Sequence, residues 1–169
     1  MPPVRDQGME STCVCQTLTG MLDVQKNSED GIMNRCNNFS INELYEQRSN
    51  KPQNGMSIKE ALSILKHRGL NNEKIDNYAL CTSIANAKQA LIANGPLAIG
   101  MMVYDNGTDE YWIRKGTQLG GHCTMLVGFD KDGFIMRNSW GTSYGNEGYI
   151  TLSYSDFNKY CMECWTITL

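Results

Sequence analysis

Three side chains that could together hydrolyse an acyl bond occur in order along this chain of 169 residues: Cys13, His122 and Asn138. A thiol becomes a strong nucleophile when a neighbouring imidazole accepts its proton, and a third group that bonds the second ring nitrogen holds the imidazole in place. Taken singly, they are a buried structural cysteine, a histidine at a strand start and an asparagine at a strand end. Together they predict a cysteine hydrolase with Cys13 as nucleophile, His122 as base and Asn138 as the orienting group.

The position of Cys13 favours a reactive thiol. Residues 12–26 carry apolar side chains at three-to-four spacing, which is typical of an amphipathic helix, and Cys13 lies at its start. The positive end of the helix dipole and the free backbone N–H groups there are expected to lower the pKa of the thiol well below about 8.5. The amide of Gln7 would form an oxyanion hole with the Cys13 N–H. The plainer interpretation of Gln7 is a polar turn residue before Gly8.

His67 is the competing base, because the chain has two histidines. It lies between Lys66 and Arg68 near the end of a predicted helix, which indicates a solvated face. We therefore rank His67 far below His122 as the group that accepts the thiol proton.

Helical patterns fill the first half of the chain and strand patterns fill the second. Capping boxes that begin at Ser40 and Ser57 mark two helix starts, and a further helix is expected over residues 82–94. Short apolar or β-branched runs predict strands at 97–104, 123–129, 133–138, 149–152 and 165–169. Residues 105–121 are rich in polar residues and glycine and are expected to form a loop or a ragged hairpin. Helices first and antiparallel strands second predict the α+β class.

Length and charge exclude several classes of protein. A chain with net charge −3 and a pI of about 5.4 is expected to form one domain, residues 1–169, with a helical part (about 1–95) and a β part (about 96–169). Scattered Lys and Arg argue against a nucleic-acid partner, and no apolar run approaches the roughly 20 residues that span a bilayer. The first residues lack the apolar core of a signal peptide, which favours an intracellular or virion-associated setting. A secreted or lysosomal setting stays open if a leader has been removed.

Seven cysteines are an odd number, so at least one thiol has no partner within the chain. Cys15 is expected to point away from the face of the helix that carries Cys13, and into the core. Cys161 and Cys164 have the spacing of half a zinc site, but without a second half the pair favours a disulfide or plain core packing. We therefore expect no metal and no other cofactor.

Several stretches resemble the papain-like cysteine peptidases in order and in setting. The anchors are Gln7-Gly8, Cys13, His122 and Asn138-Ser139-Trp140-Gly141. Residues 136–150 are especially similar to the family's Asn-Ser-Trp-Gly and Gly-Tyr segments, whereas residues 40–45 and 95–98 resemble family segments more loosely. The resemblance runs from about residue 2 to about residue 152, which is nearly the whole chain.

The resemblance implies a papain-like fold, with a helical N-terminal lobe, an antiparallel β-barrel-like C-terminal lobe and the active-site cleft between them. It implies the catalytic roles given above for Cys13, His122 and Asn138, and a place for Gln7 in the oxyanion hole. Trp140 would shield the contact between His122 and Asn138 from water. The residues that the resemblance places at the substrate are Gly55, Met56, Gly121 and Trp140.

Some positions depart from the family pattern. Glu10 stands where the family has an upstream disulfide cysteine and Val14 replaces an aromatic residue, so the usual disulfides of the helical lobe cannot form in their usual pattern. In this the chain resembles a variant of the family that often lacks those bridges. Gly121 stands where an Asp often precedes the histidine, and Gly55-Met56 stands where the family has Gly-Gly. These changes affect the cleft and its S2 specificity more than the triad.

The sequence thus predicts a cysteine endopeptidase that attacks a peptide or protein substrate through a Cys13 thiolate–His122 imidazolium pair and an acyl-enzyme. Two alternatives stay open: a catalytically weak papain-like module that binds a peptide or protein partner, and an acyl-transfer enzyme or amide hydrolase for non-peptide substrates. The usual pro-segment is not part of the sequence, so we expect it to have been removed or to be replaced by a partner inhibitor or by redox control.

Overall fold

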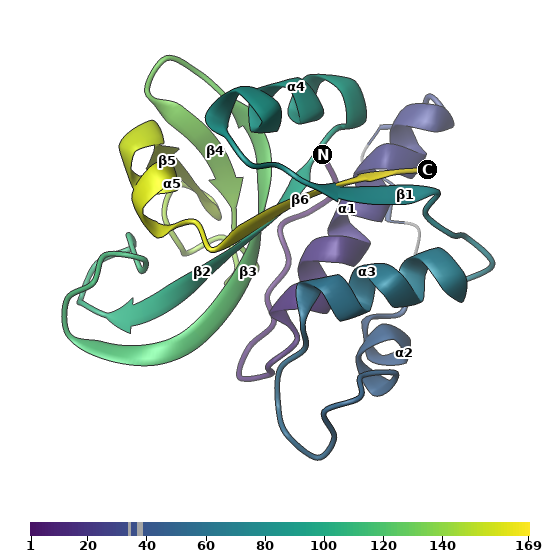
Figure 1. Cartoon of the computed structure of the whole chain (residues 1–169), viewed down its shortest axis with the longest axis horizontal. Helices are drawn as coiled ribbons and strands as arrows, with labels where there is room; N and C mark the ends of the chain where they lie inside the picture. The colour runs from purple at the N-terminus through teal and green to yellow at the C-terminus, as the bar shows by residue number, and fades with distance from the viewer. Residues whose placement is uncertain (34, 37–38) are drawn as a thin grey trace.

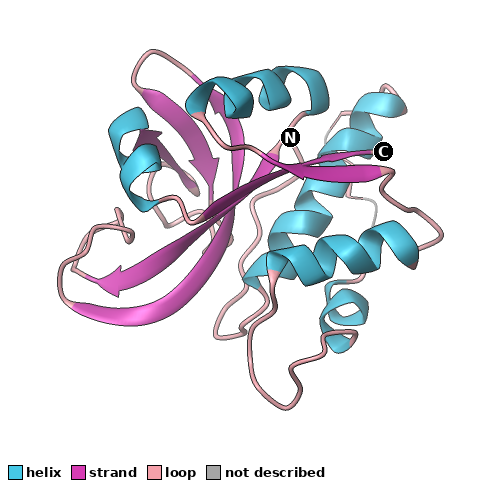
Figure 2. Ribbon diagram, in the orientation of Figure 1, coloured by secondary structure: helices cyan, strands magenta, loops and turns pink. Residues whose placement is uncertain are grey.

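The computed structural model describes residues 1–33, 35–36 and 39–169. The helices are α1 (Cys13–Glu29), α2 (Ile41–Glu46), α3 (Ile58–His67), α4 (Ile84–Asn94) and α5 (Tyr154–Tyr160). The strands are β1 (Asn77–Leu80), β2 (Leu97–Asp105), β3 (Thr117–Phe129), β4 (Gly133–Arg137), β5 (Tyr149–Ser153) and β6 (Glu163–Thr168). The helices α1, α2 and α3 lie on one side of the molecule, whereas α4 and α5 lie beside the strands of the sheet (Figure 1, Figure 2). In the part of the chain that the structure describes, no helix is long and apolar enough to cross a membrane.

Side-chain caps fix the starts of most helices. The hydroxyl of Ser40 accepts from the backbone N–H of Glu43 at the start of α2, and Ser57 does the same with Glu60 at the start of α3. Both predicted helix starts are therefore confirmed. Ser83 caps α4, which for this reason begins at Ile84 rather than at residue 82.

The strands form one antiparallel sheet in the order β1-β6-β2-β3-β4-β5, with β1 and β5 at its edges. The α+β class is confirmed, and the sheet is open rather than a closed barrel. The β2–β3 hairpin extends into both ends of the segment expected to be a loop or a ragged hairpin, at residues 105 and 117–121, with a register shift between Val103 and Tyr104. As a result His122 lies within β3, not at a strand start as the sequence predicted.

Two elements were not predicted. The strand β1 has a mostly exposed pattern without apolar alternation, and it is defined by its pairing with β6. The helix α5 follows Ser153, whose hydroxyl accepts from the N–H of Asp156. That Ser-x-x-Asp signal was present in the sequence, whereas nothing local marks β1.

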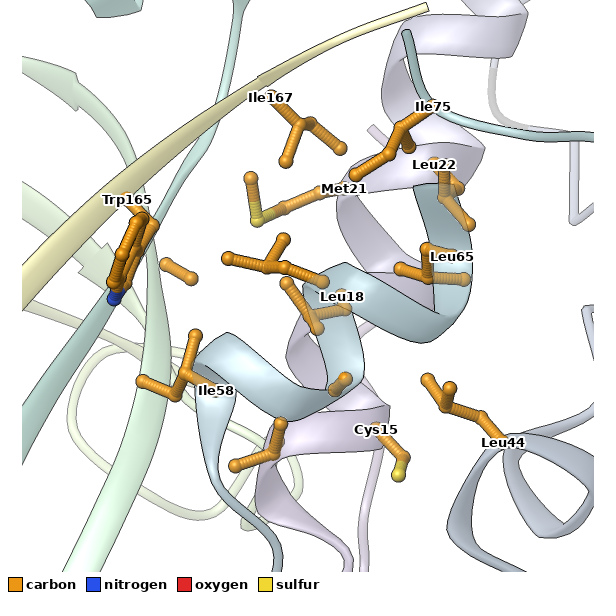
Figure 3. Packing of buried hydrophobic residues seen from close by; sticks show 14 of the residues in the cluster. Cys15, Leu18, Met21, Leu22, Leu44, Ile58, Leu65, Ile75, Trp165 and Ile167 are labelled. Atoms are coloured by element: carbon orange, nitrogen blue, oxygen red, sulfur yellow. The ribbon is translucent and has the colours of Figure 1, made fainter. Parts of the chain in front are cut away.

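Apolar side chains gather in two clusters, one on each face of the sheet. The first lies between α1, α3 and β6, where Leu18, Leu65 and Ile167 meet (Figure 3). The second lies on the other face and includes Phe134 from β4 and Ala87 from α4. The helix α4 precedes residue 95 but packs on the sheet, so the predicted helical part, residues 1–95, contributes to both clusters. The division of the domain near residue 95 stays a prediction.

The N-terminal segment ties the two sides together. Its backbone meets the segment after β4, where the N–H of Gln7 donates to the carbonyl of Ser139 (2.8 Å) and the N–H of Gly141 donates to the carbonyl of Arg5 (3.0 Å). The Arg5 guanidinium reaches α1, where it donates to the fully buried carboxylate of Asp23 at 2.7 Å. A buried, charge-assisted bond therefore holds the N-terminal segment against the first helix.

Removing the guanidinium takes the cation away from a fully buried carboxylate, so we expect Arg5→Met to lower the free energy of unfolding by about 3–5 kcal/mol. The double variant Arg5→Met/Asp23→Leu should recover most of that loss, because it buries no lone charge. Urea denaturation measures all three proteins. Lys131→Met, which breaks an exposed pair with Asp132, is the control that should change little; equal losses in the single and double variants would contradict the role of the pair.

Candidate active site

Cys13 is the first residue of α1. In the described structure the N-cap residue, Thr12, makes no side-chain capping bond. The first backbone N–H groups of α1 therefore have no side-chain cap at the end of the helix that carries the Cys13 thiol. Burial nevertheless raises the pKa of the Cys13 thiol, and hydrogen bonds from the backbone of Cys123, Val14 and Cys13 itself lower it by less. The expectation of a pKa well below 8.5 is therefore wrong for the free protein, because the cost of burying a thiolate exceeds the help from the helix end.

His122 and Asn138 are joined by a buried hydrogen bond. His122 Nε2 lies 2.8 Å from Asn138 Oδ1, and the same oxygen accepts from the backbone N–H of Ser139 at 2.8 Å. A carbonyl oxygen only accepts, so Nε2 must carry the proton. In the neutral ring the lone pair is then on Nδ1, which is the nitrogen that can take a proton from a thiol.

Burial controls the charge of His122, which is 7% exposed. It lowers the pKa of the imidazole from 6.5 to about 4, against a smaller opposing effect of the bond to Asn138. Thiol and imidazole are therefore both neutral near pH 7 in the empty site. Proton transfer from Cys13 to His122 would create two opposite charges together, so that each reduces the burial cost of the other.

Aromatic rings enclose the imidazole. Trp140 stacks on His122 with ring centroids 4.5 Å apart and planes 19° apart, and Tyr111 meets the edge of His122 at 5.4 Å. Tyr144 in turn packs edge-on against Trp140. This arrangement suits the predicted shielding by Trp140, which lies against the ring. Neither Tyr111 nor Tyr144 was assigned a role from the sequence. Tyr111 reaches His122 and Trp140 from the loop between β2 and β3, whereas Tyr144 lies only four residues after Trp140.

Gln7 is held beside the same segment. Its Oε1 accepts from Ser139 Oγ at 2.6 Å, and its Nε2 donates to the carbonyl of Glu10 at 2.7 Å. An amide nitrogen has two protons, so one remains for an oxyanion. Ser139, which the sequence motif includes without a role of its own, therefore links Gln7 to the loop that carries Asn138.

A cleft of about 820 Å³ brings most of the predicted residues together. Those that line it are Gln7, Cys13, Gly55, Met56, Gly121 and His122, while Asn138 and Trp140 lie behind the imidazole. The backbone of Gly55 has partners of its own, since its N–H donates to Tyr45 Oη and its carbonyl accepts from Asn50 Nδ2. The space beside Gly121 is open, with no atom within 4 Å of the point where a Cβ would lie.

The other candidates lie elsewhere. His67 is exposed on α3, with its Nδ1 2.8 Å from the carbonyl of Ser63, away from the residues that line the cleft. Cys15 is fully buried in the helical cluster, as expected. Cys164 is buried and Cys161 half-buried, and each of the seven cysteines of the described chain is a free thiol. Among residues 1–33, 35–36 and 39–169, no three His, Cys, Asp or Glu side chains are grouped to hold a metal ion.

Known proteins have sequences similar to this one. A family model described as papain family cysteine protease matches residues 13–167. Cysteine proteinase 3 of Entamoeba histolytica is 28% identical over 195 residues, which cover 95% of this chain and 62% of the relative. Procathepsin L of Felis catus is 24% identical over 199 residues, which cover 94% of this chain and 59% of the relative. The chain thus spans about three fifths of the length of these two proteins.

A solved structure shows the same fold. Xylellain, a cysteine protease from Xylella fastidiosa, matches with a TM-score of 0.82 and 20% identity over 99% of this chain and 84% of that chain.

The buried imidazole makes stability depend on pH. Between pH 6.5 and about 4 the unfolded chain binds a proton at His122 that the folded chain does not, so stability is full above pH 6.5 and falls as the pH drops to 4. From pH 7 to pH 4 we expect the free energy of unfolding to fall by about 3 kcal/mol more in the wild type than in His122→Gln. Urea titrations at each pH measure this. A smaller fall in the wild type would instead show an imidazole that is already protonated at rest.

Proposed function

We propose that this chain, which belongs to the papain family of cysteine proteases, is a thiol endopeptidase that cleaves peptide bonds within protein substrates. One observation carries the proposal above all: the bond between His122 Nε2 and Asn138 Oδ1 leaves Nδ1 as the basic nitrogen on a ring that lines the same cleft as Cys13. A thiol, a base of fixed tautomer and an open cleft are the parts that acyl transfer to sulfur needs.

In the proposed reaction an extended peptide lies in the cleft and Cys13 Sγ attacks the scissile carbonyl carbon. The thiol proton moves to His122 Nδ1, which gives the thiolate–imidazolium pair as the bond forms. The oxyanion accepts hydrogen bonds from the backbone N–H of Cys13 and from the second Nε2 proton of Gln7. His122 then protonates the leaving amine, and a water molecule, deprotonated by the same nitrogen, hydrolyses the acyl-enzyme.

Two other functions of the cleft compete with this one. A binding module would hold a peptide partner without turnover, and an acyl-transfer or amide-hydrolase function would use the same groups on non-peptide substrates. The ordered His122–Asn138 bond favours catalysis over binding, since a module that only binds has no need of a fixed tautomer. We further propose that a pro-segment or a protein inhibitor would occupy the cleft; one relative is by its name a pro-form, procathepsin L.

The charges of the cleft point to a class of substrate. Among the described residues that line it, the charged side chains belong to Glu10 and Glu163. Glu163 is half-buried, and its Oε2 accepts from Trp165 Nε1 at 2.6 Å, which fixes the carboxylate. Its partner in the β2–β6 register is Gly100, and the side chains of Glu163 and Ile58 lie over that glycine. We propose that the part of the cleft beside the Glu163 carboxylate is a space that takes a Lys or Arg side chain of the substrate.

Replacing the nucleophile tests the activity. We expect Cys13→Ala to lower kcat/KM for peptide hydrolysis at least about a thousandfold, because the oxyanion hole alone retains little of the rate. Cys15→Ala is the matched control: it removes the neighbouring thiol, which packs in the core, and should keep kcat in the fraction that folds. Iodoacetamide labelling followed by peptide mapping should find Cys13 modified first.

Substrate panels separate the candidate functions. Measuring the turnover of peptides, isopeptides and small acyl esters shows which class of acyl donor is the substrate. If Cys13→Ala cleaves as fast as the wild type, or if the wild type binds peptides without cleaving any, the endopeptidase proposal fails.

Neutralising Glu163 tests the substrate class. Glu163→Gln keeps the shape and an acceptor for Trp165 Nε1 but removes the charge. We expect kcat/KM for a peptide with Arg in this space to fall by about 10- to 100-fold, because a charge-assisted bond is lost, while a Leu peptide changes little. Glu10→Gln is the control, since that carboxylate is exposed and should matter far less. Equal losses on both peptides would remove the assignment.

A further inference from the structure

Two cysteines face each other where β1 and β6 end their pairing. The register of these antiparallel strands runs to Leu80 opposite Trp165, and the next opposed pair is Cys81 and Cys164. The N–H of Cys81 donates to the carbonyl of Cys164 at 2.8 Å, which continues the ladder by one step. Cα atoms of a hydrogen-bonded antiparallel pair lie about 5.5 Å apart. That spacing falls within the range of about 4.4–6.8 Å that a disulfide needs.

The two side chains also lie on the same face of the sheet. Cys81 and Cys164 both belong to the cluster around α4 and α5, whereas Trp165, one residue further along β6, belongs to the helical cluster on the other face. The two sulfurs are close enough for a side-chain hydrogen bond. Both are free thiols, and neither lines the cleft that holds Cys13.

We propose that Cys81 and Cys164 are a dithiol that closes to a disulfide when the protein meets a small-molecule disulfide such as oxidised glutathione. The bridge would join β1, an edge strand held by one neighbour, covalently to β6. It is independent of the proposed peptidase activity, because it uses none of the residues given a role in that reaction.

The exchange proceeds in two steps that balance. The Cys81 thiolate attacks one sulfur of oxidised glutathione, which forms a mixed disulfide and releases one glutathione thiolate. Cys164 then loses its proton and attacks the Cys81 sulfur, which releases the second. Two protein thiols are oxidised, one glutathione disulfide is reduced to two glutathione molecules, and the two protein protons end on the released thiolates.

The order of attack follows from exposure and acidity. Cys81 is 9% exposed and Cys164 is 1% exposed, so the small disulfide reaches Cys81 first. The hydrogen bond from Cys164 lowers the pKa of Cys81 and outweighs burial, while the pKa of Cys164 is raised, so Cys81 is the more acidic thiol of the pair. Thiolate, not thiol, is the attacking species.

Cys161 is the neighbouring thiol that could compete. It is half-buried, and burial raises its pKa to about 12, so little of it is thiolate near neutral pH. It also precedes β6 and has no place in the β1–β6 register. We therefore expect Cys161 to stay reduced while the opposed pair closes.

The experiment equilibrates the whole chain with reduced and oxidised glutathione, blocks the remaining thiols and maps the digest by mass spectrometry without reduction. The expected result is a linked peptide pair that joins Cys81 to Cys164. The linked protein should unfold about 10 °C higher than the reduced one, because the bridge closes a long loop in the unfolded chain. Cys161→Ala is the matched control and should form the same link.

A second variant reports on the first step. Cys164→Ala removes the resolving thiol, so we expect a stable glutathione adduct on Cys81. The wild-type map does not depend on how well this variant folds. A link that joins Cys161 to either cysteine, or no Cys81–Cys164 peptide with oxidised glutathione in large excess, would overturn the proposal. The result does not depend on peptide turnover, which is measured separately with Cys13→Ala.

Discussion

The hydrogen bond between His122 and Asn138 is the constraint on which the rest of the site depends. It is short, it is buried, and it sets which ring nitrogen carries the proton. The pairing of β3 with β4 brings the two residues together, because Met125 lies opposite Arg137 and the chain turns away just after β4. The stacked ring of Trp140 covers the imidazole. Strand register, not loop conformation, therefore positions the base.

The same burial that orders the site opposes its charged form. Burial keeps water from His122, so protonating the imidazole costs more than in solution. Burial likewise makes it more costly to deprotonate the thiol of Cys13, because a buried thiolate also lacks solvation. A lone imidazolium or a lone thiolate is therefore unfavourable here, while the pair is less so. The uncapped start of α1 supplies N–H groups whose interaction strengthens as negative charge develops on sulfur or on an oxyanion. Catalysis in such a site rests on charges that appear together.

Local patterns in the sequence predicted the catalytic residues better than they predicted the residues packed around them. The family membership, the α+β class and the starts of α2 and α3 were predicted, because motifs and capping signals are local. The strand β1 and the clamp of Ser139 on Gln7 were not, because each joins segments far apart in the chain. The acidity of Cys13 was misjudged for a related reason: a helix start is visible in a sequence, but the burial that outweighs it is not.

The strand β6 shows how one register serves three needs. Successive side chains of a strand point to opposite faces, so Trp165 enters the helical core while Cys164 meets the cluster below α4, and Glu163 reaches the cleft. A slip by one residue would move all three to the wrong face. Two neighbours prevent it: β2 pairs Gly100 with Glu163, and β1 continues its ladder to Cys81. The exposed edge strand β1 thus contributes to the charge pattern of the cleft by fixing the strand beside it.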